Sequence, residues 1–186
     1  MKNSDQIKNI NAVVLYILEH FKEDVDYIKL FKIMYFAQRK SLVTYGQPAV
    51  DDTFKVGFKG PVPVLTNKVF KNIEDGIKVD RDLSAFAKSI SVKNQKVTGN
   101  KKANKYYLSV ANIKCLDWAI AEYKDMSSEE LSKLSHDKVY NDVAQRATED
   151  PQKDVFTNID IARSGGATEE MLDFIREREC IKILLS

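Results

Sequence analysis

Apolar residues recur at helical spacing over several stretches of the chain. Near the start they follow one another at intervals of three and four: Ile7, Ile10, Val14, Ile17 and Phe21. This spacing predicts an amphipathic helix with one buried face. The first half of residues 26–46 is apolar nearly all round, apart from a narrow polar strip at Lys29 and Lys32. We therefore expect a central buried helix that ends at Gly46, because glycine readily adopts the positive φ of a helix C-terminus.

The helical period stops after Gly46, and residues 52–58 alternate well enough to predict a short strand. In the "GPVP" that follows, Gly60 permits an unusual backbone angle, while Pro61 and Pro63 restrict φ and remove N–H donors. Helical spacing then resumes at Val62, Leu65, Val69 and Ile73. The residues thus predict a rigid corner that directs a helix, and a plain strand-to-helix connection is their favoured interpretation.

Residues 89–92 and 105–109 predict two further strands, joined by a polar loop that contains Gly99 and Asn100. Together with residues 52–58 they would form a small antiparallel sheet. The loop region is locally basic, with lysines at Lys93, Lys96, Lys101, Lys102 and Lys105. These lysines are the candidate nucleic-acid surface. A solvated hairpin tip is the favoured alternative, because the cluster lacks arginine, the residue that most often reads bases.

The rest of the chain predicts helices over residues 110–126, 127–135 and 136–147, and a helical hairpin over 158–180. Small, turn and apolar residues in this hairpin have the spacing of a helix-turn-helix: Ala162, Gly166, Leu172 and Ile175. Its second helix, however, would present acidic residues to the DNA phosphates: Glu169, Glu170, Asp173 and Glu177. We therefore expect this hairpin to pack or to hold a protein rather than to bind DNA.

Composition favours one soluble domain over residues 1–186. Hydrophobic residues make up 44% and charged residues 30%, with a formal net charge of +2. This balance is typical of a globular α+β protein, here mainly helical, and the charge is too small to predict binding to nucleic acid or membranes by long-range attraction. The distant Cys115 and Cys180 predict reduced thiols. Without a signal peptide or an apolar run of about 20 residues, the expected location is the cytoplasm, not a membrane.

The usual catalytic motifs are missing from the sequence. It has no phosphate-binding GxxxxGK[ST], no GxSxG and no HExxH. With only His20 and His136 as histidines, we expect no metal, no cofactor and no enzymatic activity. A hydrolase or transferase that uses His136 with Asp137 is the alternative, and a histidine with a structural hydrogen bond is favoured over it.

The stretch "KLFKIMYFAQRKSLVTYGQPAVDDTFKVGFKGPVPVLTNKVF" resembles the characteristic block of the Panacea domain, the SocA-like antitoxin family. The matching residues are Lys29, Leu30, Lys32, Tyr35, Ala37, Tyr45, Gly46, Pro48, Gly60, Pro61 and Val62. "LSKLSH" at 131–136 and "DIARSGGATEEMLDFI" near the end are similar to further family segments. The resemblance is strongest over residues 29–70 and weaker after residue 78.

This resemblance implies a bacterial or phage-associated antitoxin that neutralises a cognate toxin, usually encoded by an adjacent gene, through direct protein–protein binding. The candidate partner-binding residues are Tyr35, Tyr45, Phe58, Gly60, Pro61, Val62, Phe70 and His136. For the aromatic residues among them, a place in the core is the favoured alternative. Val139 and Tyr140 stand where the family often has a tryptophan, and the separate DNA-binding domain of some members is not evident.

Overall fold

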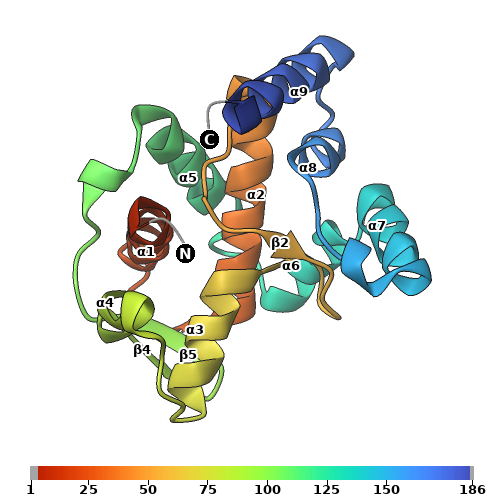
Figure 1. Cartoon of the computed structure of the whole chain (residues 1–186). Coiled ribbons are helices and arrows are strands. Elements are labelled where there is room, and N and C mark those ends of the chain that lie inside the picture. Colours follow the sequence, from red (N-terminus) through yellow and green to blue (C-terminus); the bar gives the residue numbers. More distant parts are fainter. Residues whose placement is uncertain (1–3, 185–186) are drawn as a thin grey trace.

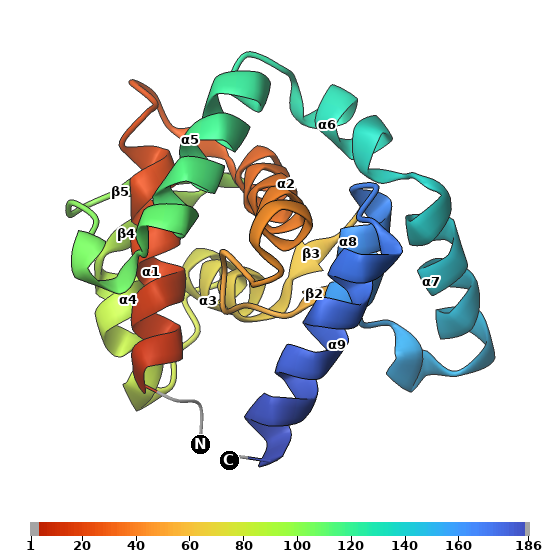
Figure 2. The same ribbon diagram turned by 90° about the horizontal axis from the view of Figure 1, so that it is seen from above.

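Helix α2 (Tyr27–Tyr45) lies at the centre of the fold in the computed structural model, which describes residues 4–184. Figures 1 and 2 show the other helices arranged around it. The helices packed directly against it are α1 (Ser4–Leu18), α5 (Val110–Tyr123), α6 (Ser128–Ser135) and α8 (Asn158–Ser164). The expected α+β fold, mainly helical around a buried central helix, is confirmed.

Both ends of α2 lie where the sequence predicts them. At the start, the Asp26 carboxylate accepts hydrogen bonds from the backbone N–H groups of Ile28 (2.8 Å) and Lys29 (3.2 Å). At the end, Gly46 has a φ of +62° and donates its N–H to the Leu42 carbonyl. The predicted polar strip is wrong at Lys32, because this lysine is fully buried.

The strands form two small antiparallel sheets instead of the single sheet predicted. In one sheet the order is β1 (Val25–Asp26), β5 (Lys96–Gly99) and β4 (Ile90–Lys93), and in the other β2 (Phe54–Lys55) pairs with β3 (Val62–Pro63). The β4–β5 hairpin turns at Asn94 and Gln95, which both have positive φ. This register places Val92 opposite Val97, with both side chains in the core.

The predicted strand over residues 105–109 is wrong. Lys105–Tyr107 form a short 3₁₀ helix, because the Asn104 side chain accepts a hydrogen bond from the Tyr106 N–H and so caps a helical turn. Gly99 and Asn100 therefore end a strand rather than form the hairpin turn.

Helix α3 (Val64–Glu74) begins at the predicted corner and is capped from outside the helix. Its N-cap residue is Pro63, which has no side-chain hydrogen bond to offer. The buried Asp52 takes this role: its carboxylate accepts from the N–H groups of Leu65 and Thr66, both at 2.9 Å, and from the Thr66 hydroxyl at 2.7 Å. Asp52 therefore sets the direction in which α3 leaves the corner.

The remaining helices are short or peripheral. They are η1 (Arg81–Leu83), α4 (Ser84–Lys88), α7 (Lys138–Glu149), η3 (Pro151–Lys153) and α9 (Glu169–Leu184). Helices α8 and α9 pack against each other, as expected for the helical hairpin predicted there. No helix within residues 4–184 has the length and apolar content needed to cross a bilayer.

Replacement of Asp52 by alanine tests the external cap. We expect Asp52→Ala to lower the free energy of unfolding by about 2–3 kcal/mol, because it leaves buried N–H groups at the start of α3 without an acceptor. Urea unfolding measures this change. The matched control is Asp51→Ala at the neighbouring exposed position, with an expected change within about 0.5 kcal/mol. Equal effects of the two substitutions would contradict the role assigned to Asp52.

Candidate functional site

A buried lysine joins the central helix to the Gly-Pro-Val-Pro corner. The Lys32 side chain has no solvent exposure. Its Nζ donates a hydrogen bond of 2.8 Å to the Pro61 carbonyl. Burial lowers the pKa of Lys32 from 10.5 to about 7, because the charged ammonium is separated from water. The sequence pattern placed Lys32 in a polar strip of the helix. Its burial depends on the Pro61 carbonyl, an acceptor that lies far away in the chain.

The corner can reach Lys32 because residue 60 is a glycine. Gly60 has a φ of +94°, and a Cβ at this position would lie 2.1 Å from Ser135 Oγ and 3.0 Å from Lys32 Cε. A residue with a side chain at this position would therefore have a strained backbone, and its Cβ would clash with Ser135. Gly60 also donates its N–H to the Gly57 carbonyl at 2.9 Å, which closes a tight turn over residues 57–60.

Two other helices also hold this turn by hydrogen bonds. The Ser132 hydroxyl of α6 donates to the Lys59 carbonyl at 3.1 Å, and the Tyr140 hydroxyl of α7 donates to the Gly57 carbonyl at 2.8 Å. Backbone carbonyls of the turn thus accept hydrogen bonds from α6 and α7, and the carbonyl of the adjoining Pro61 accepts one from α2. The turn is consequently a rigid surface feature rather than a free loop.

Phe58 lies at the tip of this turn and is 96% exposed. Of the predicted aromatic contacts, Tyr35 and Phe70 are fully buried, and Tyr45 is partly buried against the core. The Tyr35 hydroxyl donates to Ser164, and burial raises its pKa to about 12. Tyr35 and Phe70 therefore stabilise the fold and offer no surface to a partner. Among these four aromatic candidates, Phe58 is the one that is almost fully exposed, and the sequence alone did not distinguish it from the others.

His136 does not form a dyad with Asp137. His136 lies at the C-terminus of α6, where its Nδ1 is 2.6 Å from the Ser132 carbonyl and its ring packs on Tyr140. The Asp137 carboxylate caps α7 and accepts a hydrogen bond of 2.5 Å from Ser164. Both side chains thus have structural partners, as the favoured interpretation of this histidine predicts.

A cleft of about 370 Å³ opens between the turn and helices α2 and α3. Its lining combines apolar side chains such as Phe31 and Val62 with Phe58 and the lysines Lys59 and Lys71. Lys32 also lines this space, below the surface. The cleft is therefore adjacent to the rigid turn and has a basic rim over an apolar lining.

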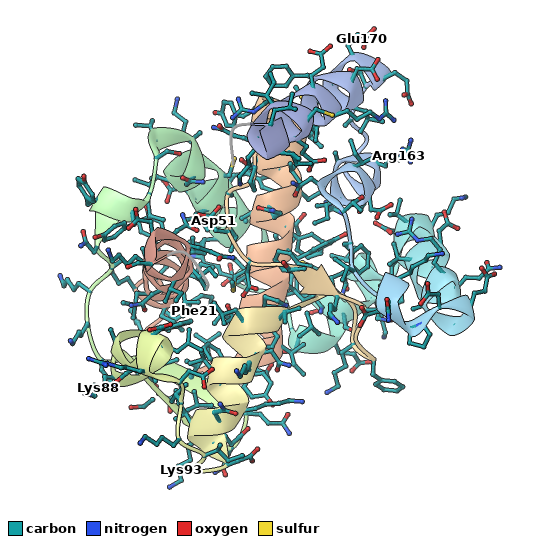
Figure 3. All side chains as sticks on the ribbon, viewed as in Figure 1. Phe21, Asp51, Lys88, Lys93, Arg163 and Glu170 are labelled. Atoms are coloured by element: carbon teal, nitrogen blue, oxygen red, sulfur yellow. The ribbon has the colours of Figure 1, made fainter. Side chains whose placement is uncertain are left out.

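The predicted basic surface is divided in the folded chain. Lys93 and Lys96 lie at the tip of the β4–β5 hairpin, and Lys101, Lys102 and Lys105 follow its other end. All of these lysines are exposed. Carboxylates lie among them: Glu74, Asp24 and Glu19 accept hydrogen bonds from Gln95, Thr98 and Ala103. Figure 3 shows Lys93 at the opposite end of the molecule from Glu170. Nucleic-acid binding by these lysines stays a prediction.

Within residues 4–184, no three His, Cys, Asp or Glu side chains are grouped so that they could hold a metal ion. Cys115 is buried and Cys180 is exposed, and both are free thiols. The chain thus combines a buried framework, a rigid turn with an exposed aromatic ring, and an adjoining cleft.

These features define a small α+β domain that presents a preformed surface. The chain belongs to the family "Antitoxin SocA-like, Panacea domain", whose sequence model matches residues 30–139. The predicted family is thereby confirmed, and with it a general role in toxin–antitoxin systems. No curated protein and no solved structure gives a significant match to this chain. The matched segment includes most of α2, the turn, most of the residues that line the cleft, and α6.

Substitution of Gly60 tests whether the turn requires a residue without a side chain. We expect Gly60→Ala to reduce the free energy of unfolding by about 3 kcal/mol or more, because it combines a strained φ with an overlap at Ser135. Gly76→Ala is the control: Gly76 has a φ of +67° but no atom within 4 Å of a Cβ. For Gly76→Ala, backbone strain alone predicts that the free energy of unfolding falls by about 1 kcal/mol. Similar losses in thermal or urea unfolding would show that the contact at Ser135 is unimportant.

The lowered pKa of Lys32 predicts a pH-dependent contribution to stability. Between pH about 7 and pH 10.5, the unfolded chain binds this proton more strongly than the folded protein does, so stability attributable to Lys32 rises with pH. Relative to Lys32→Met, wild-type stability should therefore increase by up to about 1.4 kcal/mol per pH unit in this interval. Urea unfolding at a series of pH values measures the difference. Parallel pH profiles for the two proteins would contradict the prediction.

Proposed function

We propose that this chain neutralises its toxin by binding it directly, with the turn of residues 57–60 as the centre of the contact surface. The observation that carries this proposal is the exposed Phe58 ring on a turn that α6 and α7 hold by hydrogen bonds, while α2 holds the adjoining Pro61. An aromatic side chain that remains exposed in the free protein is a typical anchor of a protein–protein interface.

Rigidity of the turn supports this proposal on energetic grounds. Association costs free energy when loops must be ordered at the interface, and a preformed turn largely avoids this cost. Binding would act by masking the active or target-binding region of the toxin, so the antitoxin needs no catalytic group, cofactor or metal of its own. The expected partner is the product of an adjacent gene.

A growth-rescue experiment with matched aromatic variants tests the proposal. The neighbouring reading frame is expressed from an inducible promoter, alone or with wild-type protein, Phe58→Ala or Tyr106→Ala. Tyr106 is the control because its ring is also highly exposed, at 87%, but lies outside the turn. We expect rescue by wild type and Tyr106→Ala, and a loss of binding of about tenfold or more for Phe58→Ala in a co-purification assay.

Thermal unfolding accompanies these assays, because an exposed ring can be removed with a stability change within about 0.5 kcal/mol. Full rescue by Phe58→Ala would exclude the turn as the contact centre. A toxin that is relieved by the wild type without forming a complex would contradict direct binding.

A further inference from the structure

We infer that the cleft beside Phe58 accepts an acidic, apolar segment of a protein partner, whose carboxylates face Lys59 and Lys71. This inference rests on the proposed function, because it specifies the chemistry of the toxin segment that would be bound. It depends on the composition, size and charge of the cleft.

The cleft is lined by basic side chains. The side chains that line the cleft include Lys32, Lys55, Lys59 and Lys71, but no aspartate or glutamate. Lys55 is neutralised by Asp154 at 3.0 Å. Lys59 and Lys71 are exposed and form no ion pair within the described residues 4–184. The rim of the cleft is therefore complementary to carboxylates.

The buried lysine below the rim adds to this charge. The Lys32 ammonium has three N–H donors, and its hydrogen bond within the described chain goes to the Pro61 carbonyl. When protonated, it places a positive charge in a region of low dielectric below the cleft. A carboxylate bound above it would be attracted more strongly than by an equal charge in water.

The apolar lining favours a peptide segment over a free anion. Ile28, Phe31, Val56, Val62 and Val64 contribute to the lining, and Phe58 extends from the adjoining turn. A volume of about 370 Å³ suits a few side chains rather than a whole folded domain. Lysines around an apolar pocket, instead of along a continuous groove, favour a protein segment over a nucleic-acid backbone.

Fluorescence polarisation with defined probes tests the inference. The probes are a labelled heptapeptide of alternating glutamate and Leu or Phe, the same peptide with glutamine in place of glutamate, and a single-stranded oligonucleotide. We expect the acidic peptide to bind at least about tenfold more tightly than its glutamine analogue. The double variant Lys59→Glu/Lys71→Glu should lose about tenfold or more of this affinity.

The control is a second pair of exposed lysines on another part of the surface. Lys93→Glu/Lys96→Glu makes the same charge change on the β4–β5 hairpin and should alter peptide affinity less than about twofold. The inference would be overturned if both peptides bound equally well, or if both double variants lost peptide affinity equally. It would also be overturned if the oligonucleotide bound at the cleft more tightly than the acidic peptide.

The two double variants in the growth-rescue assay separate this inference from the proposed function. If wild type and Lys59→Glu/Lys71→Glu rescue equally well, the cleft does not hold the toxin, although direct binding stands. If the wild type fails to rescue growth or to bind the toxin, the proposed function is overturned. The toxin is then also excluded as the partner whose segment enters the cleft. A third outcome is that Lys59→Glu/Lys71→Glu loses rescue with unchanged thermal stability, while the wild type and Lys93→Glu/Lys96→Glu still rescue. This outcome supports both the proposed function and the inference about the cleft.

Discussion

The hydrogen bond from Lys32 to the Pro61 carbonyl is the interaction on which the arrangement around α2 depends. A buried amine without an acceptor is costly, so α2 can occupy the centre with this lysine only if the corner supplies a carbonyl there. The corner can approach only because Gly60 leaves space for Ser135 of α6. One buried polar group therefore couples the central helix, the corner and α6, although they are far apart in the sequence.

A second buried polar group determines how the chain leaves the corner. Two prolines restrict the backbone and remove N–H donors, but they cannot cap the helix that follows. Asp52 provides the missing acceptors from the segment just before β2. Residues 52–66 thus form a closed unit in which a short sheet, a turn and a helix start depend on one another. Phe58 projects from this unit without weakening it, since its ring packs on nothing in the core.

Local periodicity was sufficient to predict α1, α2 and α3, because the spacing of apolar residues is a property of each segment alone. It failed at residues 105–109, where the Asn104 cap favours a helical turn over a strand. It also failed for Lys32, because burial of a lysine is decided by an acceptor on a distant residue. The aromatic candidates had equal status in the sequence, since whether Tyr35 or Phe58 is exposed depends on tertiary packing.

Most residues that carry the family resemblance differ in structural role from the exposed residues of the candidate site, although Lys32 and Val62 belong to the pattern and also line the cleft. Leu30, Lys32, Tyr35 and Gly60 are buried and build the framework of α2 and the corner. Phe58, Lys59 and Lys71 are exposed on that framework and were not part of the matching pattern. A change at one of these surface positions alters the shape or charge of the cleft without disturbing the buried contacts. The family pattern therefore mainly specifies how the surface is held, whereas the exposed side chains proposed to bind a partner lie outside that pattern.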